Sequence, residues 1–321
     1  MVSNHHGDGT PNITDGFGRT FGPQYFHFNR GKPDTSLETL YRDAEQYARP
    51  DWNVEFYDSI AQHVPNYVPT SGRGSFSAKV KLPKGSRRPI AVLSVSGVAF
   101  QDNAVDPKAL QYWADIDSDG GVSIPRVKAG KYRLTVYADG IFGDFTQDGI
   151  VILKGKQTSV SVDWKAESAG NELWRIGIPD KSSGEYRHGY ARNDRALHPQ
   201  EYRVYWSVYD FPSDFPDGVA FRVGRDDPAE ALNYVHWSVF GGYANSVRPE
   251  PVYDKINNWT LLFDVDSDDL KNKRIATFTI QLAGAKTAAG NTDVRNASEP
   301  YANLPYTVNV NGKDLEPWVI P

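Results

Sequence analysis

Short β-strand patterns separated by turns recur from Gly74 to Trp164, and this recurrence restricts the fold more than any other feature of the chain. Val, Ile, Tyr and Phe favour strands, whereas Gly, Pro, Asn and Asp favour the turns between them. The number and spacing of the patterns predict one sandwich of about seven strands. The clearest predicted strands cover residues 76–82, 90–95, 121–124, 132–137 and 159–163.

The composition agrees with an all-β chain. Aromatic residues make up 13% of the sequence, and there are 28 Gly, 21 Pro and one Met, which is unlike a helical bundle. One segment, residues 36–48, predicts a helix because its apolar side chains return at helical spacing and Ser36 or Thr35 can cap it. The Arg49-Pro50 pair is expected to end this helix.

A chain of 321 residues exceeds what one core usually covers, so several domains are expected. We place them at 1–70, 71–165 and 170–321, with linkers through Pro65 and Pro69 and at 166–170. Residues 1–33 predict a strand, a glycine-rich loop and a second strand over 24–29. Strands in the last domain are predicted at 203–208, 219–223, 260–264, 276–282 and 306–310.

Charge and hydropathy exclude several kinds of partner. A net charge of −5 disfavours nucleic acid and anionic membranes, and no apolar run approaches the roughly 18 residues of a membrane span. The chain has no cysteine, so neither disulfides nor thiolate metal sites are expected. The start of the chain does not look like a signal peptide. Three glycosylation sequons, at Asn12, Asn258 and Asn296, nevertheless favour a secreted protein, which we expect to be a monomer.

Three motifs carry a resemblance to a known family. They are Ser3-Asn4-His5, Gly-Pro-Gln-Tyr-Phe at 22–26 and Leu-Trp-Arg-Ile-Gly-Ile-Pro-Asp at 173–180. Together, and in this order, they resemble the rhamnogalacturonan endolyases of polysaccharide lyase family 4. The resemblance implies β-elimination at galacturonate in the rhamnogalacturonan I backbone of pectin. It also implies that 1–70 ends a catalytic β-sandwich, that 71–165 is fibronectin type III-like, and that 170–321 is a jelly-roll similar to carbohydrate-binding modules.

Two departures from the family pattern shape the functional hypotheses. Family members carry a large β-sandwich upstream of the segment like Ser3-Asn4-His5, including a lysine proposed to act in catalysis, and their jelly-roll has further strands at its end. We therefore expect this chain to be a fragment that is inactive by itself. Two alternatives stay open: a non-catalytic glycan-binding accessory module, and a structural remnant that binds nothing.

The resemblance points to His5 as the catalytic residue. A histidine near neutral pKa suits removal of the C5 proton of a uronide. Because neighbouring strand residues face opposite ways, His5 and His6 cannot both enter one site, and His6 is the second choice. Asn4 is a candidate substrate ligand beside it. The His5, His6 and Asp8 spacing is not a standard metal signature, so no metal or other cofactor is expected.

The last domain supplies weaker candidates for saccharide binding. Tyr205 and Trp206 can stack on sugar rings, although aromatic residues in a β-sandwich more often fill its core. Arg187 lies in a basic loop that also holds tyrosines, which suits an acidic saccharide, whereas a solvated loop is the plain alternative. Asp115, Asp117 and Asp119 alternate as in a calcium loop. No glutamate completes that motif, and the Asp-Gly-Gly that ends it predicts a β-hairpin, so a structural calcium is not supported.

Overall fold

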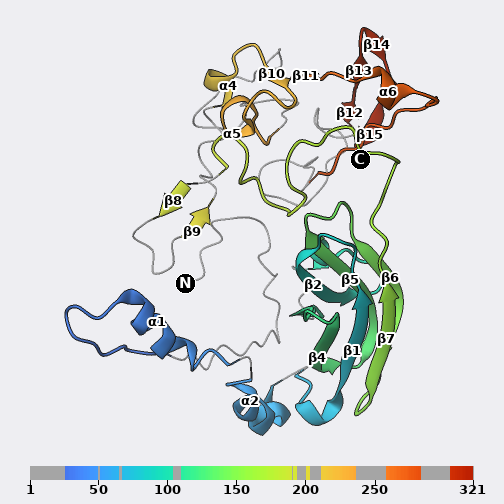
Figure 1. Cartoon of the computed structure of the whole chain (residues 1–321). Coiled ribbons are helices and arrows are strands. Elements are labelled where there is room, and N and C mark those ends of the chain that lie inside the picture. Colours follow the sequence, from blue (N-terminus) through green and yellow to red (C-terminus); the bar gives the residue numbers. More distant parts are fainter. Residues whose placement is uncertain are drawn as a thin grey trace, which may run out of the picture. The chain divides into compact units, whose positions relative to one another are not determined.

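The computed structural model describes residues 26–49, 51–64, 67–103, 110–189, 191–193, 200–202, 211–235, 258–282 and 304–320. These residues divide near Ser168 into two compact units (Figure 1). Residues in strands outnumber residues in helices, which confirms the prediction of an all-β fold. Among the described residues, no helix combines the length and the apolar character needed to cross a bilayer.

The first unit contains the predicted seven-stranded sandwich. One sheet has the order β4-β1-β7, and the other has the order β3-β2-β5-β6 (Figure 1). β1 pairs with β7 in parallel and with β4 in antiparallel fashion. The strands are β1 (Arg73–Lys81), β2 (Arg87–Val95), β3 (Tyr112–Asp115), β4 (Gly121–Lys128), β5 (Gly130–Asp139), β6 (Phe145–Ile152) and β7 (Gln157–Asp163).

Alternation along the strands builds the sandwich core. In β1 every second side chain is buried, and β5 points Tyr132, Leu134 and Val136 inward in the same way. These side chains meet Ile150 and Ile152 of β6 in one apolar cluster. Successive side chains of a strand point to opposite faces of the sheet. The pattern of apolar residues therefore fixes which face of each strand enters the core.

The turn predicted at Asp119-Gly120 is present, but the prediction that it joins two paired strands is wrong. β3 pairs with β2 and β4 pairs with β1, so the chain crosses here from one sheet to the other. The Asp117 carbonyl accepts a hydrogen bond from the Gly120 N–H at 2.8 Å, and Gly120 has a φ of +84°. Local turn chemistry selects the bend, whereas the packing of two sheets selects the partners of the strands on either side.

Asp148 of β6 ties neighbouring parts of the larger sheet together. Its carboxylate accepts bonds from Arg133 of β5, at 3.1 Å from Nε and 2.7 Å from Nη2. It also accepts the Gly97 N–H, in the segment after β2, at 2.6 Å. Hydrogen bonding by Arg133 and then by Gly97 lowers the pKa of Asp148 to about 2.

We expect this carboxylate to make the stability of the sandwich depend on pH in acid. Since the folded pKa lies below the unfolded value of about 3.9, the contribution is complete above about pH 5 and is lost as the pH falls through 4 towards 2. Asp148→Asn should flatten this decline in the free energy of unfolding, measured by urea denaturation at a series of pH values. Asp144→Asn removes a neighbouring carboxylate and leaves the Arg133–Asp148 pair intact, so it is the matched control. An unchanged acid slope in Asp148→Asn would contradict the assignment.

Two helices precede the sandwich. α1 (Leu37–Glu45) begins as predicted at Ser36, whose hydroxyl accepts the Thr39 N–H at 3.2 Å, and it ends earlier than the predicted 48. α2 (Val54–Ile60) was expected to be linker, and this expectation is wrong. Asp58 of α2 accepts the Thr70 N–H and the Tyr67 hydroxyl, so contacts later in the chain hold this short helix.

The predicted strand at 24–29 is not formed in its described part, residues 26–29. His27 Nε2 lies 2.7 Å from Asp43 Oδ2, and the Asn29 side chain donates to the Leu40 carbonyl at 2.6 Å. The polar side chains of this segment therefore bond to α1. Alternation of aromatic and polar residues predicts a strand only where another strand is available to pair with it.

The second unit contains short elements around a small apolar cluster. Val219, Phe221 and Leu232 are buried in it, and Tyr186 and Trp259 pack against them. β10 (Val219–Arg222) pairs in parallel with β11 (Trp259–Leu262), close to the predicted 219–223 and 260–264. Further short elements lie between residues 191 and 320: β8 (Ala191–Asn193), β9 (Gln200–Tyr202), α4 (Phe211–Asp214), α5 (Pro228–Ala231), α6 (Ser267–Leu270), β12 (Leu304–Tyr306), β13 (Asn309–Val310), β14 (Lys313–Asp314) and β15 (Trp318–Ile320).

Two other strand predictions for this unit need correction. Residues 276–282 contain no strand, although their apolar residues alternate with polar ones. The single strand predicted at 306–310 is divided between β12, which pairs with β15, and β13, which pairs with β14. The predicted strand at 203–208 lies outside the described residues.

Candidate functional site

The predicted site residues are distributed unevenly over the described part of the chain. Asn4, His5 and His6 lie outside the described residues, as do Tyr205 and Trp206. Their predicted roles stay predictions. Arg187 is described, and its surroundings show what the basic loop does in this fold.

Arg187 and the next residue, His188, converge on one carboxylate. Arg187 donates from Nε and Nη2 to the two oxygens of Asp214, at 2.9 and 3.0 Å. His188 Nε2 lies 2.7 Å from Asp214 Oδ2, and its ring is 5.5 Å from the ring of the buried Phe211. The cluster therefore fastens the 182–189 turn to α4.

The local sequence forces this turn. His188 has a φ of +59°, a left-handed conformation that few residues other than glycine adopt. A Cβ on the buried Gly189 would collide with the Ser183 carbonyl, so only glycine fits there. The Arg187 N–H donates to the Leu232 carbonyl at 3.0 Å. The backbone is thus held on both sides of the Arg187 and His188 side chains.

The electrostatics of the cluster favour an ionised Asp214. Hydrogen bonding from Arg187 lowers the pKa of Asp214, burial opposes this shift, and His188 adds to the lowering. Burial raises the pKa of the nearby Tyr186 to about 12, helped by the negative charge of Glu185. The Arg187 fork is thus occupied by a carboxylate of its own chain. Its prediction as a saccharide ligand stays a prediction.

We expect Asp214→Asn to destabilise the second unit by about 1–3 kcal/mol, because charge-assisted hydrogen bonds to two partly buried donors are lost. Asp264→Asn provides the control. It breaks the exposed Arg225–Asp264 pair (2.8 Å, with side chains 66% and 87% exposed) and should cost less than about 1 kcal/mol. Amide hydrogen exchange of residues 182–189 and 211–221 would report both effects. Equal losses of stability in the two variants would show that the hydrogen bonds of Asp214 to Arg187 and His188 do not stabilise the second unit.

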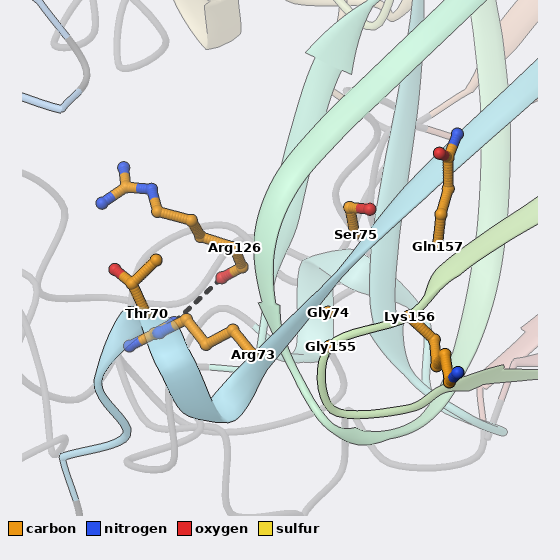
Figure 2. Close-up of a pocket in the computed structure, with 8 residues that line it drawn as sticks. All are labelled: Thr70, Arg73, Gly74, Ser75, Arg126, Gly155, Lys156 and Gln157. Atoms are coloured by element: carbon orange, nitrogen blue, oxygen red, sulfur yellow. Dashed lines mark hydrogen bonds between the residues drawn. The ribbon is translucent and has the colours of Figure 1, made fainter.

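A second polar site lies at one end of the sandwich. A shallow cleft of about 330 Å³ opens where β1 begins, bordered by β4 and by the turn between β6 and β7. Figure 2 shows Arg126 and Lys156 on opposite sides of Gly74 and Gly155, with Arg73 reaching towards Thr70. Sequence reasoning did not single out these cations. Arg126 lies 53 positions after Arg73 and 30 before Lys156, and no motif links the three residues.

In the described ranges, no group of three or more His, Asp or Glu side chains is arranged to hold an ion. The acidic run that resembles a calcium loop has another use. Asp119 accepts a bond from Lys79 at 2.9 Å and another from the Gly121 N–H at 2.9 Å. This carboxylate therefore stabilises the turn between the two sheets.

Comparison with known families agrees with the architecture. The sandwich matches the family model for polysaccharide lyase family 4, domain II, over residues 83–160. The following unit matches the carbohydrate-binding-module-like model for polysaccharide lyase family 4, domain III, over residues 172–318. Two such domains in this order define the protein as related to the polysaccharide lyases. The chain belongs to polysaccharide lyase family 4.

Curated fungal relatives match along almost the whole chain. A probable rhamnogalacturonate lyase B of Aspergillus niger is 60% identical over 313 residues, which are 97% of this chain and 44% of the relative. A probable rhamnogalacturonate lyase C of Aspergillus oryzae is 55% identical over 322 residues, 100% of this chain and 46% of the relative. Rhamnogalacturonate lyase B of Emericella nidulans is 56% identical over 315 residues, which are 98% of this chain and 47% of the relative. The chain spans less than half the length of these relatives.

Among solved structures, a minor pilin of Streptococcus agalactiae aligns with 32% of this chain and 49% of its own, at 13% identity and a TM-score of 0.21. So low a score carries no argument about fold or function.

Proposed function

We propose that this chain forms part of a secreted rhamnogalacturonate lyase that cleaves the rhamnogalacturonan I backbone of pectin by β-elimination. The observation that carries the proposal is the extent of the similarity. Relatives named rhamnogalacturonate lyases are 55% to 60% identical across 97% to 100% of the chain, which includes residues outside the two family domains.

The proposed reaction needs one base in this chain. The base removes the C5 proton of a galacturonate residue, the electron pair forms a C4–C5 double bond, and the C4–O bond to the leaving sugar breaks. We assign the proton removal to His5, with Asn4 as a neighbouring substrate ligand. An imidazole with a pKa near 6.5 is mostly neutral at pH 7 and can then accept this proton.

A hybrid enzyme tests the proposal directly. The segment of the Aspergillus niger relative that matches this chain is replaced by residues of this chain, and the hybrid is incubated with rhamnogalacturonan. We expect unsaturated uronide absorbance to develop, as it does with the unaltered relative as control. A hybrid that is folded and binds the polysaccharide but releases no unsaturated product would contradict the proposed activity.

Secretion and a monomeric state belong to the same proposal. The Asn258-Trp259-Thr260 sequon is accessible in the fold, because the Asn258 side chain is exposed at the start of β11. Its surface position suits a glycosylated extracellular protein. The negative net charge disfavours nucleic acid and anionic membranes as partners, and an acidic pectic polysaccharide would have to bind through local basic groups.

Binding of pectic glycan without catalysis is the second candidate function. It is favoured by one observation, the match of residues 172–318 to a model described as carbohydrate-binding-module-like. Retention of the 321-residue chain on immobilised rhamnogalacturonan, together with an inactive hybrid, would select this alternative over the first.

A further inference from the structure

Residues 67–72, which lead into β1, are bonded back onto α2. The Asp58 side chain of α2 accepts the Tyr67 hydroxyl at 3.2 Å and the Thr70 N–H at 3.0 Å. The Tyr67 ring stacks on the ring of Tyr57, also in α2, with ring centres 5.6 Å apart. This stretch therefore holds α2 both through a carboxylate and through an aromatic ring.

Arg73, the first residue of β1, joins the same stretch to the sandwich. Its Nε donates to the Val68 carbonyl at 2.7 Å, and its guanidinium lies 5.4 Å from the centre of the Tyr67 ring. Its Nη1 donates to the Arg126 carbonyl of β4 at 3.1 Å (Figure 2). A single planar guanidinium thus connects residues 67 and 68 with β1 and β4, a geometry that a lysine could not reproduce.

A β-bulge in β4 brings Arg126 near the residues that precede α2. Two residues of β4 oppose Ser75 alone, and Arg126 has a φ of +56°, which is costly for a residue with a Cβ. Bulges of this kind redirect a side chain. Hydrogen bonding by Arg49 lowers the pKa of Asp51, and the positive charge of Arg126 adds to this lowering. The bulge thus puts a cation of the sandwich within electrostatic reach of the start of α2.

These contacts decide whether α2 stays attached to the sandwich. α2 has seven residues and none of them is buried, so neither helix propensity nor a core of its own holds it. Parts of one chain that share no large apolar interface move independently by default. Here the hydrogen bonds of Asp58 and Arg73 and the ring contacts of Tyr67 take the place of such an interface.

We infer that residues 51–64 and 67–73 form a fixed joint, which holds α2 on the start of the sandwich and sets the direction from which the chain enters β1. A domain attached ahead of α2 is then carried at a set angle to the sandwich, not on a flexible linker. In the proposed lyase that domain is the catalytic one, so this use of the joint rests on the proposed function. The joint itself rests on the contacts of Tyr67, Arg73 and Arg126.

Amide hydrogen exchange on the 321-residue chain tests whether these contacts hold α2. Tyr67→Ala removes the stacked ring and the hydroxyl bond, so it should speed exchange of the α2 amides by about tenfold or more. Amides of residues 132–136 in β5 should change by less than about twofold, because the sandwich has its own core. The matched control is Trp113→Ala. It removes an exposed aromatic ring from β3 in the four-stranded sheet and should leave exchange of α2 unchanged.

Nuclear spin relaxation tests whether the joint is fixed. In the unaltered chain, the amides of α2 and of β5 should share one rotational correlation time. Arg73→Gln breaks the bonds to Val68 and Arg126, so α2 should then show a shorter correlation time than β5. Arg87→Gln is the control, because Arg87 is an exposed arginine that also begins a strand, and it should leave the two correlation times equal.

Several results would overturn the joint. They are independent tumbling of α2 in the unaltered chain, unchanged α2 exchange in Tyr67→Ala, unchanged relaxation in Arg73→Gln, or equal effects of the control variants. If Arg73→Gln unfolds the sandwich, as lost protection in β5 would show, Tyr67→Ala decides, since Tyr67 precedes the sandwich. An inactive hybrid whose α2 is held on the sandwich would refute the proposed lyase activity alone. An active hybrid whose α2 moves freely would refute the joint alone.

Discussion

His5→Ala in the hybrid lyase is expected to lower kcat by about 10²- to 10⁴-fold, the usual contribution of a general base. His6→Ala should lower it much less, because neighbouring residues of a strand face opposite sides and only one of the two imidazoles can enter the groove. Initial rates of unsaturated uronide release for the three proteins provide the measurement.

A pH profile separates a catalytic histidine from one that only supports the fold. In the unaltered hybrid, kcat/KM should rise with pH through an apparent pKa near 6.5, because the imidazole must be neutral to accept a proton. His5→Gln should remove this limb while leaving the affinity for rhamnogalacturonan within a few-fold. Equal losses of kcat at the two positions, or a larger loss at His6, would show that His5 is not the specific catalytic base.

Leu134→Ala is expected to destabilise the sandwich by about 2–5 kcal/mol, the range for truncating a buried leucine. Leu134 lies in the middle of β5 with an exposed fraction of 0%, in the cluster that also contains Phe76 and Ile152. Truncation removes apolar contacts and leaves a cavity. The cavity cannot close easily, because β5 is held by hydrogen bonds to β2 on one side and to β6 on the other.

Leu153→Ala removes the same atoms from the surface. Leu153 is 57% exposed and follows β6, so its loss should cost less than about 1 kcal/mol. Because residues 74–164 carry their own core, we expect them to unfold as one cooperative segment when expressed alone, with Leu134→Ala shifting that transition. A similar shift for both variants, or no cooperative transition in the isolated segment, would contradict this view of the sandwich.

The sandwich could be predicted from sequence because its strands alternate regularly. Burial of every second residue in β1, and of Tyr132, Leu134 and Val136 in β5, is already visible as apolar and polar alternation, and the turns are marked by Gly, Pro and Asp. Alternation does not name the partner of a strand. The residues around Asp119 therefore predicted a hairpin, whereas the fold sends β3 and β4 to different sheets.

The errors elsewhere share one physical cause. α2 has only seven residues, too few for intrinsic helix propensity to decide, and its Asp58 is bonded to Tyr67 and Thr70. Residues 276–282 have a strand pattern but form no strand, since a strand exists only through its neighbours. Hydrogen bonds from residues 9 and 12 positions away support α2, whereas the pattern of residues 276–282 does not by itself supply a partner strand.

The candidate sites also divide into those that a local sequence motif identifies and those that only the tertiary structure brings together. The motif around His5 and the run at 173–180 are local, so the sequence alone determined the family and, through it, the expected chemistry. The pairing of Arg187 and His188 with Asp214 joins residues 26 and 27 positions apart, and only the fold revealed that partner. The cationic cleft depends even more on tertiary structure. Arg126 reaches the rim through a bulge and Lys156 through a turn packed on Gly74, and backbone geometry of this kind is set by strand pairing, which no local pattern specifies.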